Sequence, residues 1–181
     1  RYLKLLMDEG ASVEGLEPSK EMIKYAKKYL AESSYNPDSV AVYNTSFQDF
    51  KPEKEYDYVF ISNSPITGYY ESYEKILKLA KKGIFIGEWI ERKDLFFERL
   101  VRDMGKEVKR QLAFDIYYYF NLFAADGYLP NFKSSIQVLK EEIIPESCIQ
   151  RYTSWIYGEA YTEEDRELVL KEILKYKNKG E

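Results

Sequence analysis

The stretch Ser12–Lys28, SVEGLEPSKEMIKYAKK, decides how this sequence is interpreted. The segment Ala11–Glu17 has the short pattern of a strand, and Pro18 with Ser19 then gives a signal that starts helices. Apolar residues follow at helical spacing, so we expect a helix that runs to about Ser33. A strand that leads through a tight turn into a helix is the repeating unit of an α/β fold.

The same alternation continues through the first half of the chain. We expect further strands at Ser39–Tyr43, Tyr56–Ser62 and Gly83–Trp89, and a helix at Tyr69–Lys81. The apolar run within 56–62 predicts a strand that is buried on both faces. Strands and helices that alternate every 25–30 residues or so indicate a parallel sheet with helices on both faces.

The regular alternation of strands and helices ends after Glu91, and we expect more helix in the second half of the chain. The following segments are predicted as helices at Asp94–Met104 and Gln111–Ala125, strands at Asn131–Lys140 and Cys148–Ser154, and a last helix from Thr162. The two strands are expected to form an antiparallel pair, and Asp165 predicts an approximate capping box with Thr162. We find no repeat and no linker, so we expect a single domain over 1–181.

Composition narrows the classes of function. With 181 residues, 45% of them hydrophobic, the chain has enough apolar matter for a packed core. Its net charge of −4 argues against a nucleic-acid partner, and no apolar run reaches the ~20 residues that span a membrane. The oligomeric state stays open, and a homo-oligomer is compatible with the sequence.

Histidine is absent, and cysteine occurs once, at Cys148. The first fact excludes histidine bases and histidine metal ligands, and the second excludes internal disulfides and thiolate clusters. We therefore expect no metal. A single cysteine that is kept reduced fits a cytoplasmic protein.

Glu17 stands at the carboxyl end of a predicted strand, where open α/β sheets bind ligands. A carboxylate there can accept hydrogen bonds from two ribose hydroxyls. It can equally be a solvent-facing acid that favours the start of the next helix. The residue alone supports the two interpretations about evenly.

Taken in order, these segments resemble class I S-adenosylmethionine-dependent methyltransferases. Ser12–Lys28 resembles the second strand and helix of that family, which often carry a strand-end acid, a Pro/Ser pair and a methionine. NTSFQDF (Asn44–Phe50) resembles the segment beside the adenine. EYDYVFISNSPI (Glu55–Ile66) and KILKLAKKGIFIGEW (Lys75–Trp89) resemble the fourth strand with its loop, and the helix and fifth strand. The tail is similar to the closing strands of the family.

The resemblance implies a Rossmann-like fold and transfer of a methyl group from S-adenosylmethionine to a small-molecule acceptor. Residues 1–91 would form the cofactor-binding half and 92–181 the substrate-side half. Glu17 would bond the ribose, and Leu16 and Pro18 would shape the adenosine slot. Ser46 and Phe47 would line the adenine side.

For the acceptor, we expect Asn63 to orient the substrate and Ser64, Ile66 and Tyr69 to contact it. The loop 63–66 faintly resembles the Asn-Pro-Pro-aromatic motif of amine methyltransferases, with Ser and Ile in place of a Pro and the aromatic. Its alternative role is a plain turn. Glu88, at the end of the fifth strand, is the candidate base, with a structural glutamate as its alternative.

The aromatic run 114–123, FDIYYYFNLF, offers Tyr117 and Tyr118 as further substrate contacts. A cage of rings attracts a sulfonium, yet the stripe of Leu112, Ile116 and Phe120 is more typical of a core helix. We expect this helix, together with Tyr128–Phe132, to roof the acceptor space.

One departure from the family concerns its glycine-rich loop, D/E-x-G-x-G-x-G, which should precede Glu17 by about 20 residues. Arg1–Glu9 reads as the end of a helix capped by Gly10, so the sequence begins inside the helix that this loop opens. Either the natural chain extends about 40 residues upstream, or that part is disordered or lies outside the structure. We expect the sheet to lack its first strand, with a gap between the strands at 11–17 and 56–62.

Two other functions stay open. One is a non-catalytic nucleotide-binding or interaction module of the same fold, because fold alone does not imply catalysis. The other is a nicotinamide-binding Rossmann domain, because an acid after the second strand serves that cofactor too.

Overall fold

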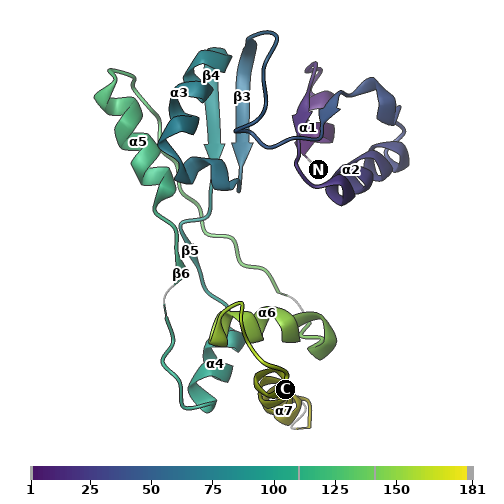
Figure 1. Ribbon diagram of the computed structural model, residues 1–181, viewed down its shortest axis with the longest axis vertical. Coiled ribbons are helices and arrows are strands. Elements are labelled where there is room, and N and C mark those ends of the chain that lie inside the picture. Colours follow the sequence, from purple (N-terminus) through teal and green to yellow (C-terminus); the bar gives the residue numbers. More distant parts are fainter. Residues whose placement is uncertain (1, 110, 141, 179–181) are drawn as a thin grey trace. The chain divides into compact units, whose positions relative to one another are not determined.

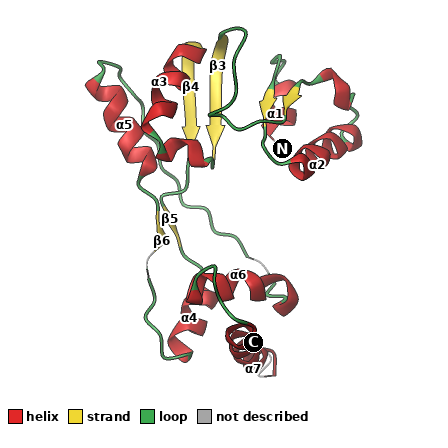
Figure 2. Ribbon diagram, viewed as in Figure 1, coloured by secondary structure: helices red, strands yellow, loops and turns green. Residues whose placement is uncertain are grey.

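The computed structural model describes residues 2–109, 111–140 and 142–178. The chain divides into two compact units, Arg1–Gly87 and Glu88–Glu181, called here the first and second unit. The boundary falls a few residues before the one predicted at 91/92. The chain mixes helices with small sheets, as expected for an α/β protein (Figures 1 and 2). That the two units form a single domain remains a prediction.

The first unit alternates helices and strands. Its elements are α1 (Tyr2–Asp8), β1 (Gly15–Leu16), α2 (Lys20–Glu32), η1 (Pro37–Ser39), β2 (Val42–Tyr43), β3 (Tyr56–Ser62), η2 (Pro65–Gly68), α3 (Tyr70–Leu79) and β4 (Ala80–Gly87). Gly10 follows α1 at a φ of +83°, which suits a glycine after a helix end. Ser19 caps α2, because its hydroxyl accepts a hydrogen bond from the backbone N–H of Met22 at 3.3 Å.

The strands of the first unit form two separate parallel pairs. β1 pairs with β2, with Leu16 opposite Tyr43, and β3 pairs with β4, with Ser62 opposite Gly87. Gly83 lies opposite Tyr58, whose ring would approach an added Cβ to 3.2 Å, so glycine gives this ring its room. In the described residues β1 does not pair with β3. The two strands are therefore not directly paired, as expected, while a missing first strand between them stays a prediction.

Several predicted strands are shorter or less buried than expected. Only Gly15–Leu16 of Ala11–Glu17 forms ladder, and only Val42–Tyr43 of Ser39–Tyr43, because Pro37–Ser39 forms a 3₁₀ turn. The strand expected at Gly83–Trp89 is β4, which ends at Gly87.

The expectation that 56–62 is buried on both faces is wrong. Ile61 is buried, whereas Tyr58 and Phe60, on the opposite face, are 69% and 38% exposed. Phe60 instead stacks on Phe85 of β4 at 4.8 Å and meets Tyr2 of α1 at 5.0 Å. Ring contacts from β4 and α1 thus cover part of this face, while Tyr58 stays largely exposed.

The second unit consists mainly of helices. Its elements are β5 (Glu91–Arg92), α4 (Leu95–Asp103), β6 (Gln111–Leu112), α5 (Asp115–Ala125), α6 (Pro145–Tyr157) and α7 (Glu163–Asn178). Three of the helices share one core cluster: Phe97, Leu100 and Val101 of α4, Cys148, Ile149 and Tyr152 of α6, and Val169, Ile173 and Tyr176 of α7. No helix in the described residues is both long and apolar enough to cross a membrane.

The start of the last helix confirms the predicted capping box. The Thr162 hydroxyl accepts from the Asp165 N–H at 3.2 Å, and the Asp165 carboxylate accepts from the Thr162 N–H at 2.9 Å. The Thr162 N–H and the Thr162 hydroxyl both donate to the Asp165 carboxylate, and these two bonds hold the pKa of Asp165 below its usual value. Asp94 caps α4 in the same way, accepting from the Phe97 N–H at 2.9 Å.

The predicted antiparallel C-terminal strand pair is wrong. Cys148–Ser154 lies inside helix α6, which begins at Pro145, and Asn131–Lys140 contains no strand. The antiparallel pair in this unit is β5 with β6, where Glu91 faces Leu112. The helix expected from Gln111 therefore begins only at Asp115.

The reason for the helix lies in its spacing of buried residues. Cys148, Ile149, Tyr152 and Thr153 are buried, which is the one- and four-residue spacing of a helix face rather than the alternation of a strand. Residues such as isoleucine, tyrosine and threonine favour strands, but the tertiary core overrides that weak preference.

Candidate functional site

The carboxyl ends of β1 and β2 lie side by side and carry the predicted cofactor residues. The Glu17 N–H donates to the Tyr43 carbonyl at 3.1 Å, which extends the ladder by one bond. The Asn44 side-chain amide donates to the carbonyls of Glu17 (3.1 Å) and Pro18 (2.8 Å). The structure thus brings the segment with Leu16, Glu17 and Pro18 next to the segment that leads into Ser46 and Phe47.

Asn44 was not among the predicted site residues, although it opens the NTSFQDF segment. Its two hydrogen bonds act as a clamp between the strand ends. The signal that could have found it is an asparagine directly after a strand, because such residues often bond neighbouring backbone.

The Glu17 carboxylate can serve both the start of α2 and a ligand. The carboxylate is half-buried, and one of its oxygens accepts from the Ser19 N–H at 2.9 Å at the start of α2. Among the described residues, the other oxygen takes no hydrogen bond. One oxygen therefore serves the helix start, while the second can still accept a bond from a ligand.

Ser46 and Phe47 lie in a tight turn that is stabilised by hydrogen bonds between its own residues. The Ser46 hydroxyl donates to the Asp49 carboxylate at 2.7 Å and accepts from the Asp49 N–H at 3.1 Å. The Phe47 ring is buried, and the Lys75 ammonium lies 4.8 Å from its centre. The hydroxyl of Ser46 is thus engaged within its own turn, and Phe47 anchors the turn to α3.

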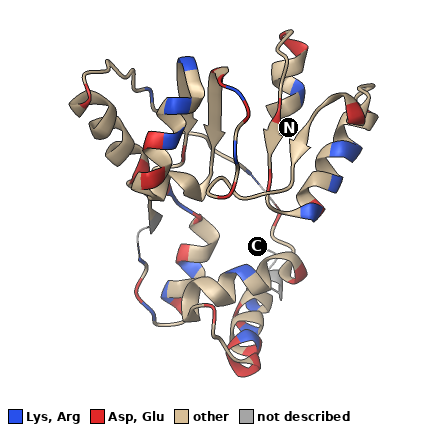
Figure 3. Ribbon diagram, turned by 45° about the horizontal axis from the view of Figure 1, so that its top comes forward, with Lys and Arg blue, Asp and Glu red and all other residues tan. Residues whose placement is uncertain are grey.

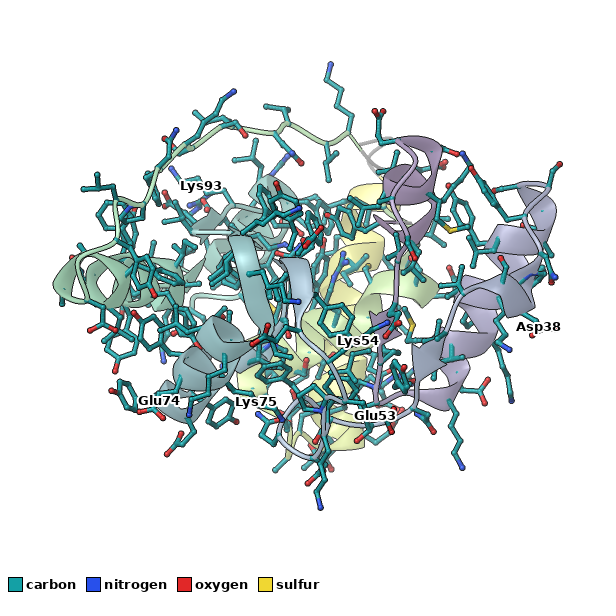
Figure 4. The ribbon with its side chains drawn as sticks, turned by 90° about the horizontal axis from the view of Figure 1, so that it is seen from above. Asp38, Glu53, Lys54, Glu74, Lys75 and Lys93 are labelled. Atoms are coloured by element: carbon teal, nitrogen blue, oxygen red, sulfur yellow. The ribbon has the colours of Figure 1, made fainter. Side chains whose placement is uncertain are left out.

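Lys75 of α3, labelled in Figure 4, holds this turn in place. Its ammonium donates to the carbonyls of Phe47, Gln48 and Phe50. Burial lowers the pKa of Lys75 from its ordinary value. Sequence reasoning missed this role, because a lysine in a lysine-rich helix reads as a solvated charge.

Glu14, just before β1, is a polar hub like Lys75, meaning that one charged group forms several hydrogen bonds to other segments of the first unit. Its carboxylate accepts from the hydroxyls of Tyr56 (2.7 Å) and Tyr43 (3.1 Å) and from the ammonium of Lys54. These bonds hold the pKa of Glu14 below its usual value, while burial and Glu14 raise the pKa of Tyr56. Because Tyr43 belongs to β2 and Tyr56 to β3, Glu14 links the two strand pairs.

The predicted acceptor loop lies at the carboxyl end of β3. Asn63 is exposed and has a φ of +47°, a left-handed conformation that asparagine tolerates better than most residues. Its N–H donates to the carbonyl of Gly87, the last residue of β4, at 2.8 Å. Ser64 caps the turn η2 by accepting from the Ile66 N–H at 3.5 Å. The structure therefore groups Asn63, Ser64 and Ile66, and it presents the Asn63 amide to solvent.

Two further candidates flank this loop in the sequence. Tyr69 is 53% exposed at the start of α3. Glu88 is half-buried and is the first residue of the second unit. Nothing in the structure tests whether either contacts a substrate, so both remain predictions.

The aromatic helix α5 and the segment after it come together, as expected. Phe132 stacks on Tyr117 at 5.5 Å and meets Phe120 edge-on at 5.9 Å. Tyr117 and Tyr118 are 40% and 47% exposed, whereas Tyr119 is fully buried. The helix thus uses Tyr119 for packing and leaves Tyr117 and Tyr118 accessible, while their part in a roof over the acceptor stays untested.

The charged side chains of α2 lie on its exposed surface. Lysines follow one another along α2 with a glutamate near each end, as Figure 3 shows, and Lys24 pairs with Glu21 at 2.7 Å. Within residues 2–109, 111–140 and 142–178, no three cysteine, aspartate or glutamate side chains gather as metal ligands. No protein-family model matches this chain, and no curated protein matches it significantly.

Proposed function

We propose that this chain binds S-adenosylmethionine and transfers its methyl group to a small-molecule acceptor. The observation that carries the proposal is the strand arrangement of the first unit. β1–β2 and β3–β4 are both parallel pairs, and no described residue of β1 pairs with β3. One parallel strand between β1 and β3 would join them in a Rossmann-like sheet that winds outward from its centre. This is the order of the class I methyltransferases that the sequence resembles.

The residues at the strand ends fit the cofactor. The second carboxylate oxygen of Glu17 has no hydrogen-bond donor among the described residues, so it can receive a ribose hydroxyl. Leu16 and Pro18 flank Glu17, and the Asn44 clamp fixes the Ser46–Phe47 turn beside them. When bound, the cofactor supplies a methyl group already activated by its positive sulfur.

The remaining work of the protein is alignment. Asn63 presents its amide at the end of β3 and would orient the acceptor, with Ser64 and Ile66 next to it. Because the chain has no histidine, a proton that must be removed would pass to a carboxylate, a tyrosine or water. Glu88 is our candidate for that carboxylate.

Calorimetric titration of the full-length protein with S-adenosylhomocysteine tests the cofactor site. We expect Glu17→Gln and Glu17→Ala to weaken binding by about 1.5–3 kcal/mol, the range for hydrogen bonds to a charged group. Glu21→Ala is the matched control, because it removes an exposed acid of α2 that pairs only with Lys24 among the described residues. Unchanged affinity in both Glu17 variants would remove Glu17 from the site.

The same protein distinguishes the alternative functions. Binding of NADH in place of S-adenosylhomocysteine would favour a nicotinamide-binding domain. Binding of S-adenosylhomocysteine without methyl labelling of any compound in a metabolite extract would favour a non-catalytic module. We expect labelling, and we expect Asn63→Ala and Asn63→Gly to lower turnover while cofactor affinity stays nearly intact.

A further inference from the structure

Two arginines of the second unit converge on one tryptophan. The guanidinium carbon of Arg92, in β5, lies 5.0 Å from the ring centre of Trp155 in α6. The guanidinium carbon of Arg151, one turn earlier in α6, lies 5.3 Å from the same ring. An indole attracts one guanidinium through its electron-rich face, but it does not neutralise the charge of two.

Among the residues that the structure describes, neither guanidinium is paired with an acid. In the part of the chain that the structure describes, Arg92 and Arg151 form no ion pair. The Nε of Arg151 is buried and donates to no described acceptor. Arg102 of the same unit behaves differently, because it pairs with Glu98 at 3.6 Å. Buried donors are normally satisfied, but among the described residues the Arg151 Nε has no acceptor.

The nearby Asp94 carboxylate already accepts a hydrogen bond at each of its two oxygens. One oxygen of Asp94 accepts from the Phe97 N–H at 2.9 Å, and the other accepts from the Tyr152 hydroxyl at 2.8 Å. Burial and Asp94 raise the pKa of Tyr152, and Arg151 opposes them. Asp94 and Arg151 thus have opposite effects on the pKa of Tyr152, and these two charged residues do not form an ion pair with each other.

The Trp155 ring that contacts the two arginines is held by other aromatic side chains. Phe97 packs edge-on against Trp155 at 5.1 Å, and Tyr152 lies 5.8 Å from it. Phe97 and Tyr152 belong to the buried core shared by α4, α6 and α7. A ligand held beside Trp155 would therefore meet donors whose support is set by the core rather than by a loop.

We propose that Arg92 and Arg151 bind a small oxyanion, a carboxylate or phosphate group, beside Trp155. A guanidinium offers paired N–H donors that match both groups, and such charge-assisted bonds are stronger than neutral ones. The oxyanion would accept from the terminal N–H groups of the two guanidinium groups and would neutralise both arginines. This site lies wholly within the second unit and is independent of the proposed methyl transfer.

Trp155 is itself the reporter for the test. In a Trp89→Phe background it is the one remaining tryptophan, so its fluorescence follows the site. The full chain is titrated with sodium phosphate and, separately, with sodium succinate, with ionic strength held constant by sodium chloride. We expect a saturable change with at least one of them, and Arg92→Gln and Arg151→Gln should each raise the apparent Kd at least about tenfold.

Arg102→Gln is the matched control and should leave the Kd unchanged, because its charge is already paired. Arg92 is exposed, so Arg92→Gln keeps the test valid even if Arg151→Gln disturbs α6. Saturation by phosphate alone identifies a phosphate site, and saturation by succinate alone identifies a carboxylate site. The absence of saturation with both, or an unchanged Kd in Arg92→Gln, would overturn the proposal.

Discussion

The two units of this chain are stabilised in different ways. In the second unit, three helices share one cluster of buried side chains, centred on residues such as Leu100, Tyr152 and Val169. In the first unit, the strands form two short parallel pairs, and the polar hubs Glu14 and Lys75 tie them to their surroundings. A helix satisfies its own backbone, whereas a parallel strand needs neighbours on both sides. The comparison teaches that the helical unit gathers its buried side chains in one cluster, while the first unit adds polar links to its own buried side chains, such as Ile61 and Ile76.

The largest effect should come from the core of the second unit. Tyr152→Ala removes a fully buried ring and its bond to Asp94, and should cost about 3–5 kcal/mol of unfolding free energy in urea. Tyr152→Phe keeps the ring and should cost about 1.5–3 kcal/mol, because only the hydrogen bond to a carboxylate is lost. A similar cost for both variants would contradict the importance of the ring.

Native-state hydrogen exchange on Tyr152→Ala tests whether the first and second units are stabilised separately. Amides of α4, α6 and α7 should lose protection, and those of β3 and β4 should keep theirs, if each unit is stabilised on its own. Equal loss of protection in both units would break the comparison.

A middle-sized effect is expected at Glu14. Glu14→Gln removes the charge that Tyr43, Tyr56 and Lys54 share, and should cost about 1–3 kcal/mol in urea unfolding. Because the folded-state pKa of Glu14 is lowered, its contribution is complete above the unfolded pKa and is lost as pH falls through the folded one. The parent protein should therefore lose stability below about pH 4.5, and the variant should lose less.

Glu55→Gln is the control for Glu14. Glu55 is exposed and pairs with Lys81 at 3.5 Å, so its loss should change stability by less than about 1 kcal/mol. A pH dependence that is identical in the parent and in Glu14→Gln would show that Glu14 is not the titrating link.

The smallest effect concerns the loop after β3. Asn63 has a φ of +47°, so a β-branched residue there is strained, and Asn63→Val should cost about 1–2 kcal/mol in thermal unfolding. Asn63→Gly should stay within about 0.5 kcal/mol of the parent, because glycine adopts this conformation freely but gains freedom in the unfolded chain. If valine is tolerated as well as glycine, the left-handed conformation is not required.

Much of the first unit could be predicted because its signals are local. Ser19 marks the start of α2, and the apolar run 56–62 marks β3 with the bounds that the structure has. The separation of β1 from β3 also followed from the sequence, through the resemblance to a known strand order. The polar hubs did not, since Glu14 meets Tyr56 across 42 positions and no local pattern encodes that contact.

In the candidate site, the sequence indicated the positions and the structure supplied the partners. Glu17 and Asn63 fall at strand ends, as expected, but the Asn44 clamp and the Lys75 anchor required three-dimensional contacts. The same holds for Arg92 and Trp155, which are 63 positions apart by number and meet only in the folded unit.

The sequence by itself determined the start of α2, the strand–helix alternation of the first unit and the capping box at Thr162, because each depends on neighbouring residues. Only the tertiary structure decided the fate of Cys148–Ser154 and Asn131–Lys140. The first became helix α6 because its buried face joins the core of α4 and α7, and the second forms no strand because no described segment pairs with it. A strand needs a partner to bond its backbone, so strand propensity alone does not decide whether a segment enters a sheet.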